Sequence, residues 1–193
     1  MKSSHPIVLA AASPRRRELL AQLVENFEVA APDIDEALVE GESPGDYVLR
    51  LSRAKALAGY SQSGGRLPVL GSDTIVLLDD EILCKPESRM EAESMLGRLS
   101  GRTHEVYSGV ALVLDSETIL EEINITSVTF AEMPSAWITM YCRTDEPMDK
   151  AGAYAVQGGT GQFISRIEGS YSGVMGLPLF ETSQLLRYAG LLE

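Results

Sequence analysis

Cysteine and histidine are scarce in this chain of 193 residues, which contains two of each. Cys84 and Cys142 lie far apart in the sequence, so they indicate neither a disulfide framework nor the close spacing of metal ligands. With only His5 and His104 available, a zinc hydrolase is a poor candidate. The sequence therefore favours a reducing compartment.

Long hydrophobic runs are also missing. No apolar stretch approaches the ~20 residues that a membrane-spanning helix needs, and we expect a cytoplasmic, soluble protein with no membrane partner. A glycine-rich loop ending in Gly-Lys-Ser or Gly-Lys-Thr is absent too, which argues against a P-loop phosphotransferase.

Positive charge is in deficit, because 28 Asp and Glu outnumber 16 Lys and Arg and give a formal net charge of -12. Repulsion along most of the surface opposes nucleic acid as a partner. Against this background Arg15, Arg16 and Arg17 stand together directly after an apolar run. A local basic cluster in an acidic protein suits a small phosphate-bearing ligand better than a polymer.

The arginine cluster falls in the first turn of a predicted helix. Ser13 is a good N-cap and Pro14 suits the first helical position. Cations at this end of a helix are unfavourable unless an anion is bound there. The pattern predicts a phosphate cradle between a strand and a helix; a solvated surface cluster is the alternative.

Strands and helices alternate along the chain, which predicts an α/β fold: a mixed twisted sheet flanked by helices, with residues 1–193 as one domain. The predicted strands are 7–12, 27–30, 69–78, 81–84, 106–114, 119–130 and 163–167. Helices are predicted to begin at Ser13, Ser43 and Ser88, and to cover 134–142 and 178–188. The charged segment 143–150 is the best candidate for a lobe boundary or a moving flap.

Asp73 is an acid inside an otherwise apolar strand, preceded by the small residues Gly71 and Ser72. A carboxylate near a core needs a cation, a metal or hydrogen bonds, so Asp73 is a candidate metal ligand or general base. The alternative is an Asp at a strand end that accepts backbone hydrogen bonds. Glu36, in an acidic loop, is a candidate second oxygen ligand for Mg²⁺, although such loops are often only solvated.

Three further side chains have the chemistry of a nucleotide site. Lys55 falls within the apolar stripe of its helix, where it either extends to the rim or reaches a buried anion. Lys85 follows a predicted hairpin that could return it to the same cleft, or it is an ordinary loop lysine. Gln157 precedes a glycine-rich segment, and its amide offers both a donor and an acceptor to a base edge; a plain turn is the alternative.

These features together resemble the Maf family of nucleoside triphosphate pyrophosphatases over nearly the whole chain. The motifs that carry the resemblance are Ser13-Pro14-Arg15-Arg16, Asp35-Glu36, Arg53-Ala54-Lys55-Ala56, Gly71-Ser72-Asp73-Thr74, Lys85-Pro86, Ser100-Gly101-Arg102-Thr103-His104, Asp149-Lys150-Ala151-Gly152-Ala153-Tyr154, Gly169-Ser170-Tyr171 and Gly176-Leu177-Pro178. One departure is Ala11, which stands where the family commonly has a serine.

The resemblance implies two lobes with a central cleft, as in the inosine triphosphate pyrophosphatases, a homodimer, and hydrolysis of a nucleoside triphosphate to monophosphate and pyrophosphate. Arg15, Thr74 and Gln157 match the branch that acts on dTTP and UTP, whereas the branch associated with 7-methyl-GTP differs at the positions of Thr74 and Gln157. A nucleotide-binding regulator of cell division without turnover is the competing hypothesis.

The resemblance also suggests a role for each site residue. Glu36 and Asp73 are expected to hold a divalent cation, Mg²⁺ or Mn²⁺, with Asp73 also orienting or deprotonating the attacking water. Lys55 and Lys85 are expected to assist catalysis by neutralising phosphate charge. The expected substrate-binding residues are Ser13, Arg15, Arg16, Thr74 and Gln157.

Overall fold

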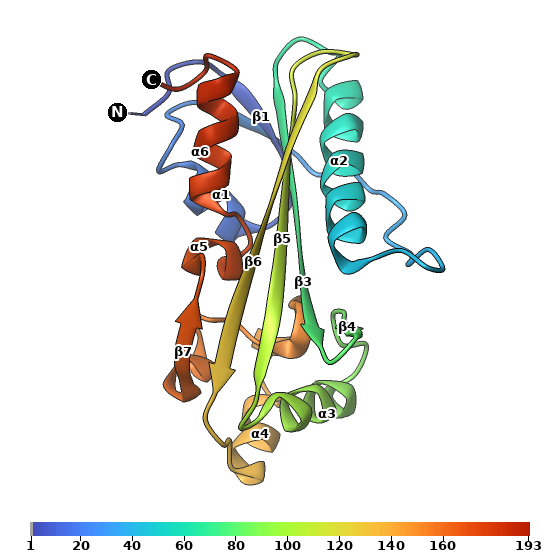
Figure 1. The fold of residues 1–193 in the computed structure, drawn as a ribbon, viewed down its shortest axis with the longest axis vertical. Coiled ribbons are helices and arrows are strands. Elements are labelled where there is room, and N and C mark those ends of the chain that lie inside the picture. The colour runs from blue at the N-terminus through green and yellow to red at the C-terminus, as the bar shows by residue number, and fades with distance from the viewer. Residues whose placement is uncertain (1) are drawn as a thin grey trace.

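The computed structural model describes residues 2–193 and contains one seven-stranded mixed sheet with helices on both faces (Figure 1). The strand order is β2 (Phe27–Ala30), β1 (Ile7–Ala10), β3 (Val69–Leu78), β5 (Thr103–Val113), β6 (Ile119–Phe130) and β7 (Ile164–Glu168), with β4 (Glu81–Leu83) also paired to β3. Strand β1 runs parallel to β2 and β3, and the other pairs are antiparallel. The predicted mixed α/β fold is confirmed.

Four of the six α-helices in residues 2–193 begin at a serine that caps them, and the fourth and sixth begin after a proline instead. Their bounds are α1 (Pro14–Leu20), α2 (Pro44–Gln62), α3 (Arg89–Leu99), α4 (Ser135–Tyr141), α5 (Tyr171–Met175) and α6 (Leu179–Tyr188). Ser13, Ser43 and Ser88 each accept a backbone N–H three residues on, as predicted. None of the helices within residues 2–193 is long and apolar enough to cross a membrane.

Two boundaries differ from the sequence prediction for local reasons. Strand β1 ends at Ala10 rather than Ala12, because its pairing with β3 stops at Gly71 and the chain then turns to reach the cap at Ser13. Strand β5 begins earlier than predicted, at Thr103, where pairing with Thr129 on β6 extends the ladder. A hydrophobicity pattern does not detect such extensions, because the residues at the strand end are polar.

Two hydrophobic cores lie at opposite ends of the long central strands. One surrounds β1, α1 and α6, and the other lies between β3, α3 and α4 (Figure 1). The predicted lobe boundary at 143–150 is wrong, because Cys142 before the segment and Ala153 after it belong to the same core. Part of this segment is a 3-10 helix, Glu146–Asp149, rather than a loop. The lobes are joined by the strands themselves.

Helix α2 lies unusually close to the sheet, because glycines face it on two neighbouring strands. A Cβ atom on Gly71 would come within 2.3 Å of the Ser52 carbonyl oxygen, and one on Gly109 within 2.7 Å of the Ser52 hydroxyl. Any larger residue at either position would push the helix away. This close packing places the Ser52 hydroxyl 2.9 Å from the Asp73 backbone N–H, which donates to it.

His104 is buried in the second core, 2% exposed, and its Nε2 is 2.8 Å from the Tyr154 hydroxyl. Its ring stacks on Phe130 at a centroid distance of 5.3 Å. Burial lowers the pKa of His104 to about 4. The imidazole is therefore neutral across the physiological pH range.

A pH-dependent loss of stability follows from this buried imidazole. Between pH 6.5 and 4 the unfolded chain binds a proton at His104 and the folded chain does not, so acidification favours unfolding. We expect the free energy of unfolding to fall by about 2 kcal/mol between about pH 7.5 and 5. Urea unfolding of His5→Gln, in which the exposed imidazole is removed, should show this slope of the unfolding free energy with pH. Urea unfolding of His104→Gln should lack it. A slope that persists in His104→Gln would contradict this assignment.

Candidate active site

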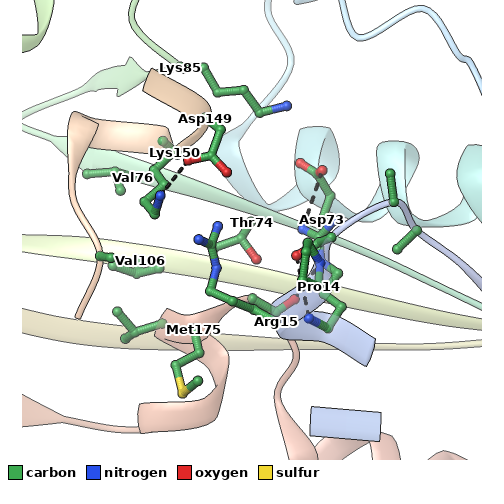
Figure 2. A pocket seen from close by; sticks show the side chains of 18 of the residues that line it. Pro14, Arg15, Asp73, Thr74, Val76, Lys85, Val106, Asp149, Lys150 and Met175 are labelled. Atoms are coloured by element: carbon green, nitrogen blue, oxygen red, sulfur yellow. Dashed lines mark hydrogen bonds and ion pairs between the residues drawn. The ribbon is translucent and has the colours of Figure 1, made fainter. Parts of the chain in front are cut away.

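A cavity of about 390 Å³ opens between the lobes, at a gap along one edge of β3 (Figure 2). Strand β1 pairs with β3 only as far as Gly71, and β4 pairs with it only from Val76 onward. On this edge, residues 72–75 therefore have no strand beside them. Because side chains alternate along a strand, Asp73 and Thr74 approach the cavity from opposite faces of the sheet.

All nine residues predicted for the site line this one cavity. They are Ser13, Arg15, Arg16, Glu36, Lys55, Asp73, Thr74, Lys85 and Gln157. Arg17 is exposed and lies outside the cavity lining. Of the three arginines, it is therefore the one that fits the alternative of a solvated surface cluster. Ala11, the departure from the family pattern, also lines the cavity and is 5% exposed.

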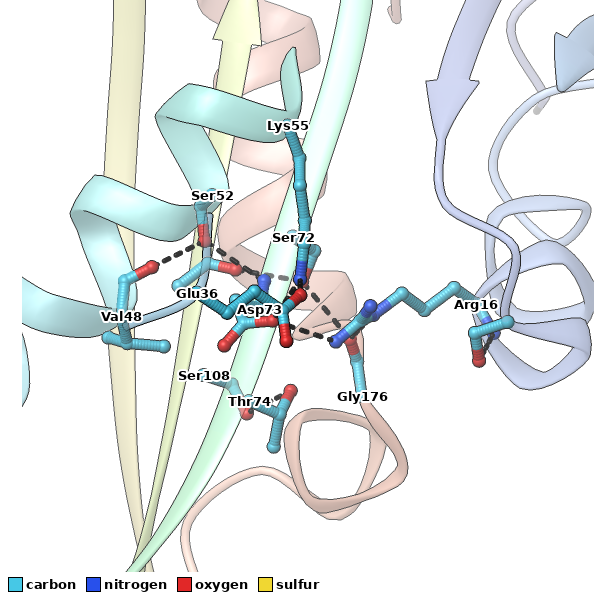
Figure 3. A network of polar contacts seen from close by, with 12 residues as sticks. Arg16, Glu36, Val48, Ser52, Lys55, Ser72, Asp73, Thr74, Ser108 and Gly176 are labelled. Atoms are coloured by element: carbon cyan, nitrogen blue, oxygen red, sulfur yellow. Dashed lines mark hydrogen bonds and ion pairs between the residues drawn. The ribbon is translucent and has the colours of Figure 1, made fainter. Parts of the chain in front are cut away.

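One part of the cavity wall is densely charged (Figure 3). The Lys55 Nζ lies 2.5 Å from Asp73 Oδ1 and 2.6 Å from Glu36 Oε1, so one ammonium joins the two carboxylates. The Lys55 side chain is 11% exposed, which excludes the alternative that it extends to the solvent rim. The carboxylate of Asp73 pairs with this lysine, and among residues 2–193 no backbone N–H donates to it.

Two more cations surround the same carboxylates. Arg16 Nη2 is 3.9 Å from Asp73 Oδ1, and Lys85 Nζ is 3.9 Å from Glu36 Oε2. Burial alone would raise the pKa of Glu36, but its hydrogen bond to Lys55 and the neighbouring positive charges lower that pKa below its usual value. Glu36 is therefore ionised near neutral pH, although it sits beside a second carboxylate.

Arg16 is held in place by a contact that the sequence did not reveal. Its Nε donates to the carbonyl oxygen of Gly176 at 2.8 Å, and the Ser72 hydroxyl lies 3.0 Å from the same oxygen. Gly176 has a φ of 123°, a backbone conformation that favours glycine. This turn after α5 therefore aims the guanidinium at Asp73, and Gly176 acts through its backbone, which leaves no side-chain signal in the sequence.

Apart from the ion pair of Asp149 and Lys150, the rest of the cavity lining is mostly apolar (Figure 2). Thr74 lies there among apolar side chains contributed by β3, β5 and α5, namely Val76, Val106, Val174 and Met175 (Figure 2). Gln157 also lines the cavity and is exposed, and no hydrogen bond to its side chain is found within residues 2–193. An apolar surface with a few polar groups is typical of the site for a flat heterocycle.

The donor set suits a hard divalent cation only in combination with a ligand. Within the described chain, residues 2–193, no three His, Cys, Asp or Glu side chains come close enough to hold a metal ion. Mg²⁺ is usually bound by one or two carboxylates together with water and substrate phosphates. Glu36 and Asp73 supply that number, and Asp73 Oδ2 has no hydrogen-bond partner among residues 2–193. Their chemistry therefore fits such an ion.

A family model described as Maf-like protein matches residues 6–189. The chain belongs to the Maf family. The match spans every strand and helix named above and all nine predicted site residues. The resemblance inferred from the motifs is thereby confirmed.

Several curated proteins are similar to this chain over almost their full length. A dTTP/UTP pyrophosphatase of Vibrio parahaemolyticus serotype O3:K6 is 49% identical over 187 residues, which cover 97% of this chain and 98% of that protein. A dTTP/UTP pyrophosphatase of Escherichia coli strain K12 is 50% identical over 180 residues, covering 93% and 91%.

Two solved structures also match this chain over most of its length. A Ham1 protein of Staphylococcus aureus matches with a TM-score of 0.47 and 14% identity, covering 82% of this chain and 90% of that one. A HAM1 protein of Coxiella burnetii matches with a TM-score of 0.46 and 20% identity, covering 67% and 75%.

Proposed function

We propose that this Maf-family chain is a nucleoside triphosphate pyrophosphatase that hydrolyses dTTP and UTP to the monophosphate and pyrophosphate. The proposal is supported by relatives of that name at about half identity over nearly the whole chain. Modified pyrimidine nucleotides are included in the proposed substrate class, because Gln157, which lines the cavity, is exposed.

The observation that carries this proposal is the shared ammonium of Lys55 between Asp73 and Glu36, inside a cavity that also contains two arginines. A site that only bound a polyanion would gain little from two carboxylates unless a metal ion were bound, because carboxylates repel phosphate. A hydrolase needs them, because one can take a proton from water. The arrangement thus favours turnover over the alternative of a nucleotide-binding regulator.

In the proposed reaction, water attacks the α-phosphorus and gives a proton to the Asp73 carboxylate. The bond from the α-phosphorus to the bridging oxygen breaks, and pyrophosphate leaves with the bonding electron pair. Lys55 holds Asp73 in place, and Lys85 lies at the mouth of the charged wall, 61% exposed, where it can follow the leaving group. Such positive charges stabilise the transition state more than the ground state.

We propose Glu36 and Asp73 as ligands of a divalent cation, Mg²⁺ or Mn²⁺. When bound with substrate, such an ion neutralises phosphate charge and lowers the pKa of water. Lys55 contacts one oxygen of each carboxylate, and the ion would bind the second oxygen of each, with Lys85 Nζ 3.9 Å from that of Glu36. The ammonium then orients both ligands.

Substrate binding is assigned to the rest of the cavity. Ser13, Arg15 and Arg16 are proposed to bind the phosphates, while Thr74 and Gln157 contact the base. Arg15 lines the cavity near Thr74 (Figure 2) and forms no ion pair within residues 2–193, so its guanidinium is available to the ligand. The missing hydroxyl at Ala11 is expected to weaken phosphate binding without changing the reaction.

Three further proposals rest on the sequence. Residues 1–193 are proposed to form one domain, because the central strands take part in both cores. The scarcity of cysteine supports a location in the cytoplasm. The resemblance to the Maf family supports a homodimer.

The substrate range tests the proposed function. Purified protein is incubated with each common nucleoside triphosphate and Mg²⁺ or Mn²⁺, and pyrophosphate and orthophosphate are measured separately. We expect pyrophosphate, released mainly from dTTP and UTP. Release of orthophosphate alone would indicate cleavage at the γ-phosphate and contradict the proposal. Tight triphosphate binding without any product would support the regulator instead.

A further inference from the structure

Two hydroxyls on neighbouring strands meet beside the apolar side chains of the cavity. Thr74 on β3 and Ser108 on β5 are register partners, and their Oγ atoms lie 3.3 Å apart (Figure 3). Ser108 is 1% exposed and lies behind Thr74, outside the cavity lining. Its hydroxyl is also 2.7 Å from the carbonyl oxygen of Gly173 in α5.

The direction of these hydrogen bonds is determined by the number of protons. A carbonyl oxygen can only accept, and a serine hydroxyl has one proton, so Ser108 donates that proton to Gly173. Toward Thr74 it can then only accept. The Thr74 hydroxyl proton is therefore directed at Ser108, and the oxygen presents only lone pairs to the cavity.

We infer that Ser108, acting through Thr74, makes the cavity select uracil and thymine over cytosine. This inference rests on the proposed function. At ring position N3, uracil and thymine carry an N–H donor, whereas cytosine carries a lone pair. The Thr74 oxygen, which can only accept, forms a hydrogen bond with the N–H of uracil or thymine. The same oxygen repels the lone pair of cytosine. Ser108 touches no substrate atom and is a positioning residue.

Gln157 cannot supply this selectivity by itself. Its side chain is exposed, and within residues 2–193 no hydrogen bond holds it. A free amide can rotate to offer either its oxygen or its nitrogen, so it can serve the exocyclic group of uracil or of cytosine equally well. Discrimination needs a group whose direction is fixed, and the buried Ser108–Gly173 contact fixes Thr74.

The inference is tested by comparing kcat/KM for UTP with that for CTP. In Ser108→Ala the Thr74 hydroxyl loses its acceptor and can turn its proton into the cavity. We expect the UTP/CTP ratio to fall at least about tenfold, chiefly through a lower KM for CTP, with kcat changing less. Mispositioning of the reacting groups would instead lower kcat for both nucleotides.

Thr126→Val is the matched control. In the wild type the buried Thr126 hydroxyl accepts a hydrogen bond from the Ser170 N–H at 2.9 Å, and so it anchors the same helix α5 without contacting Thr74. We expect this variant to keep the wild-type UTP/CTP ratio. An equal fall in both variants would attribute the effect to loosening of α5 and overturn the inference.

Two results separate this inference from the proposed function. Wild-type release of pyrophosphate from UTP, with an unchanged UTP/CTP ratio in folded Ser108→Ala, overturns the inference alone. Failure of the wild type to release pyrophosphate overturns the proposed function. If Ser108→Ala does not fold, Thr74→Val supplies the test: loss of the acceptor should lower kcat/KM for UTP about tenfold, while kcat/KM for CTP should not fall, because the repulsion of its N3 lone pair is removed. Equal losses for both nucleotides would overturn the inference.

Discussion

Replacing Asp73 by asparagine should lower kcat for UTP about a thousandfold, because an amide cannot take the proton of the attacking water. The side chain keeps its shape, and its amide oxygen can still accept a hydrogen bond from Lys55. We therefore expect a folded protein that still binds UTP. Steady-state kinetics with pyrophosphate detection gives the turnover, and circular dichroism with thermal melting checks the fold.

Asp80→Asn is the matched control for this variant. Asp80 is an exposed carboxylate in the turn after β3, the strand that carries Asp73, and it lies outside the cavity. Its removal changes the net charge by the same amount and should leave turnover near the wild-type value. Near-normal turnover in Asp73→Asn would show that Asp73 is not the general base.

Replacing Lys55 by methionine should lower kcat/KM by a factor of about 100 to 1,000, the loss typical of removing one group that stabilises transition-state charge. The variant also leaves Asp73 and Glu36 without the ammonium that they share. Lys55 is a main cause of the lowered pKa of Glu36, so that pKa should rise in the variant. We expect the acid limb of the pH–rate profile to move to higher pH.

Arg53→Met supplies the comparison for Lys55→Met. Arg53 lies on the same helix, but its guanidinium pairs with Glu121 on the surface, and its side chain is 47% exposed. Loss of such a pair costs at most about 1 kcal/mol. Activity and the pH–rate profile should stay as in the wild type. If Lys55→Met kept the wild-type pH profile, the ammonium would have no part in holding Glu36 ionised.

The elements with strong local signals were predictable from the sequence. Ser43 and Ser88 mark helix starts through capping chemistry, and the apolar run of β3 indicates a buried strand. Boundaries such as the early start of β5 at Thr103 depend on a partner strand, and local patterns contain no information about it. The prediction of a lobe boundary at 143–150 failed for a related reason. Charge and proline indicate a turn, but they do not indicate which lobe contains it.

The cavity residues were predictable where a side chain is out of place in its surroundings. Asp73 in an apolar strand and Lys55 on a packing face are both conspicuous, and the structure joins them. Ser108 and Gly176 left no such signal, because one is an ordinary buried serine and the other acts through its carbonyl. The sequence also could not reveal that Lys55 would stand between the two carboxylates predicted to bind metal.

The position of water attack is the most direct test of the proposed chemistry. UTP is hydrolysed in water enriched in oxygen-18, and the products are separated and analysed by mass spectrometry. Attack at the α-phosphorus predicts that the label enters UMP and that pyrophosphate is unlabelled. Label in the pyrophosphate would mean that water attacks the β-phosphorus, which would contradict the roles given to Asp73 and to the cations around it.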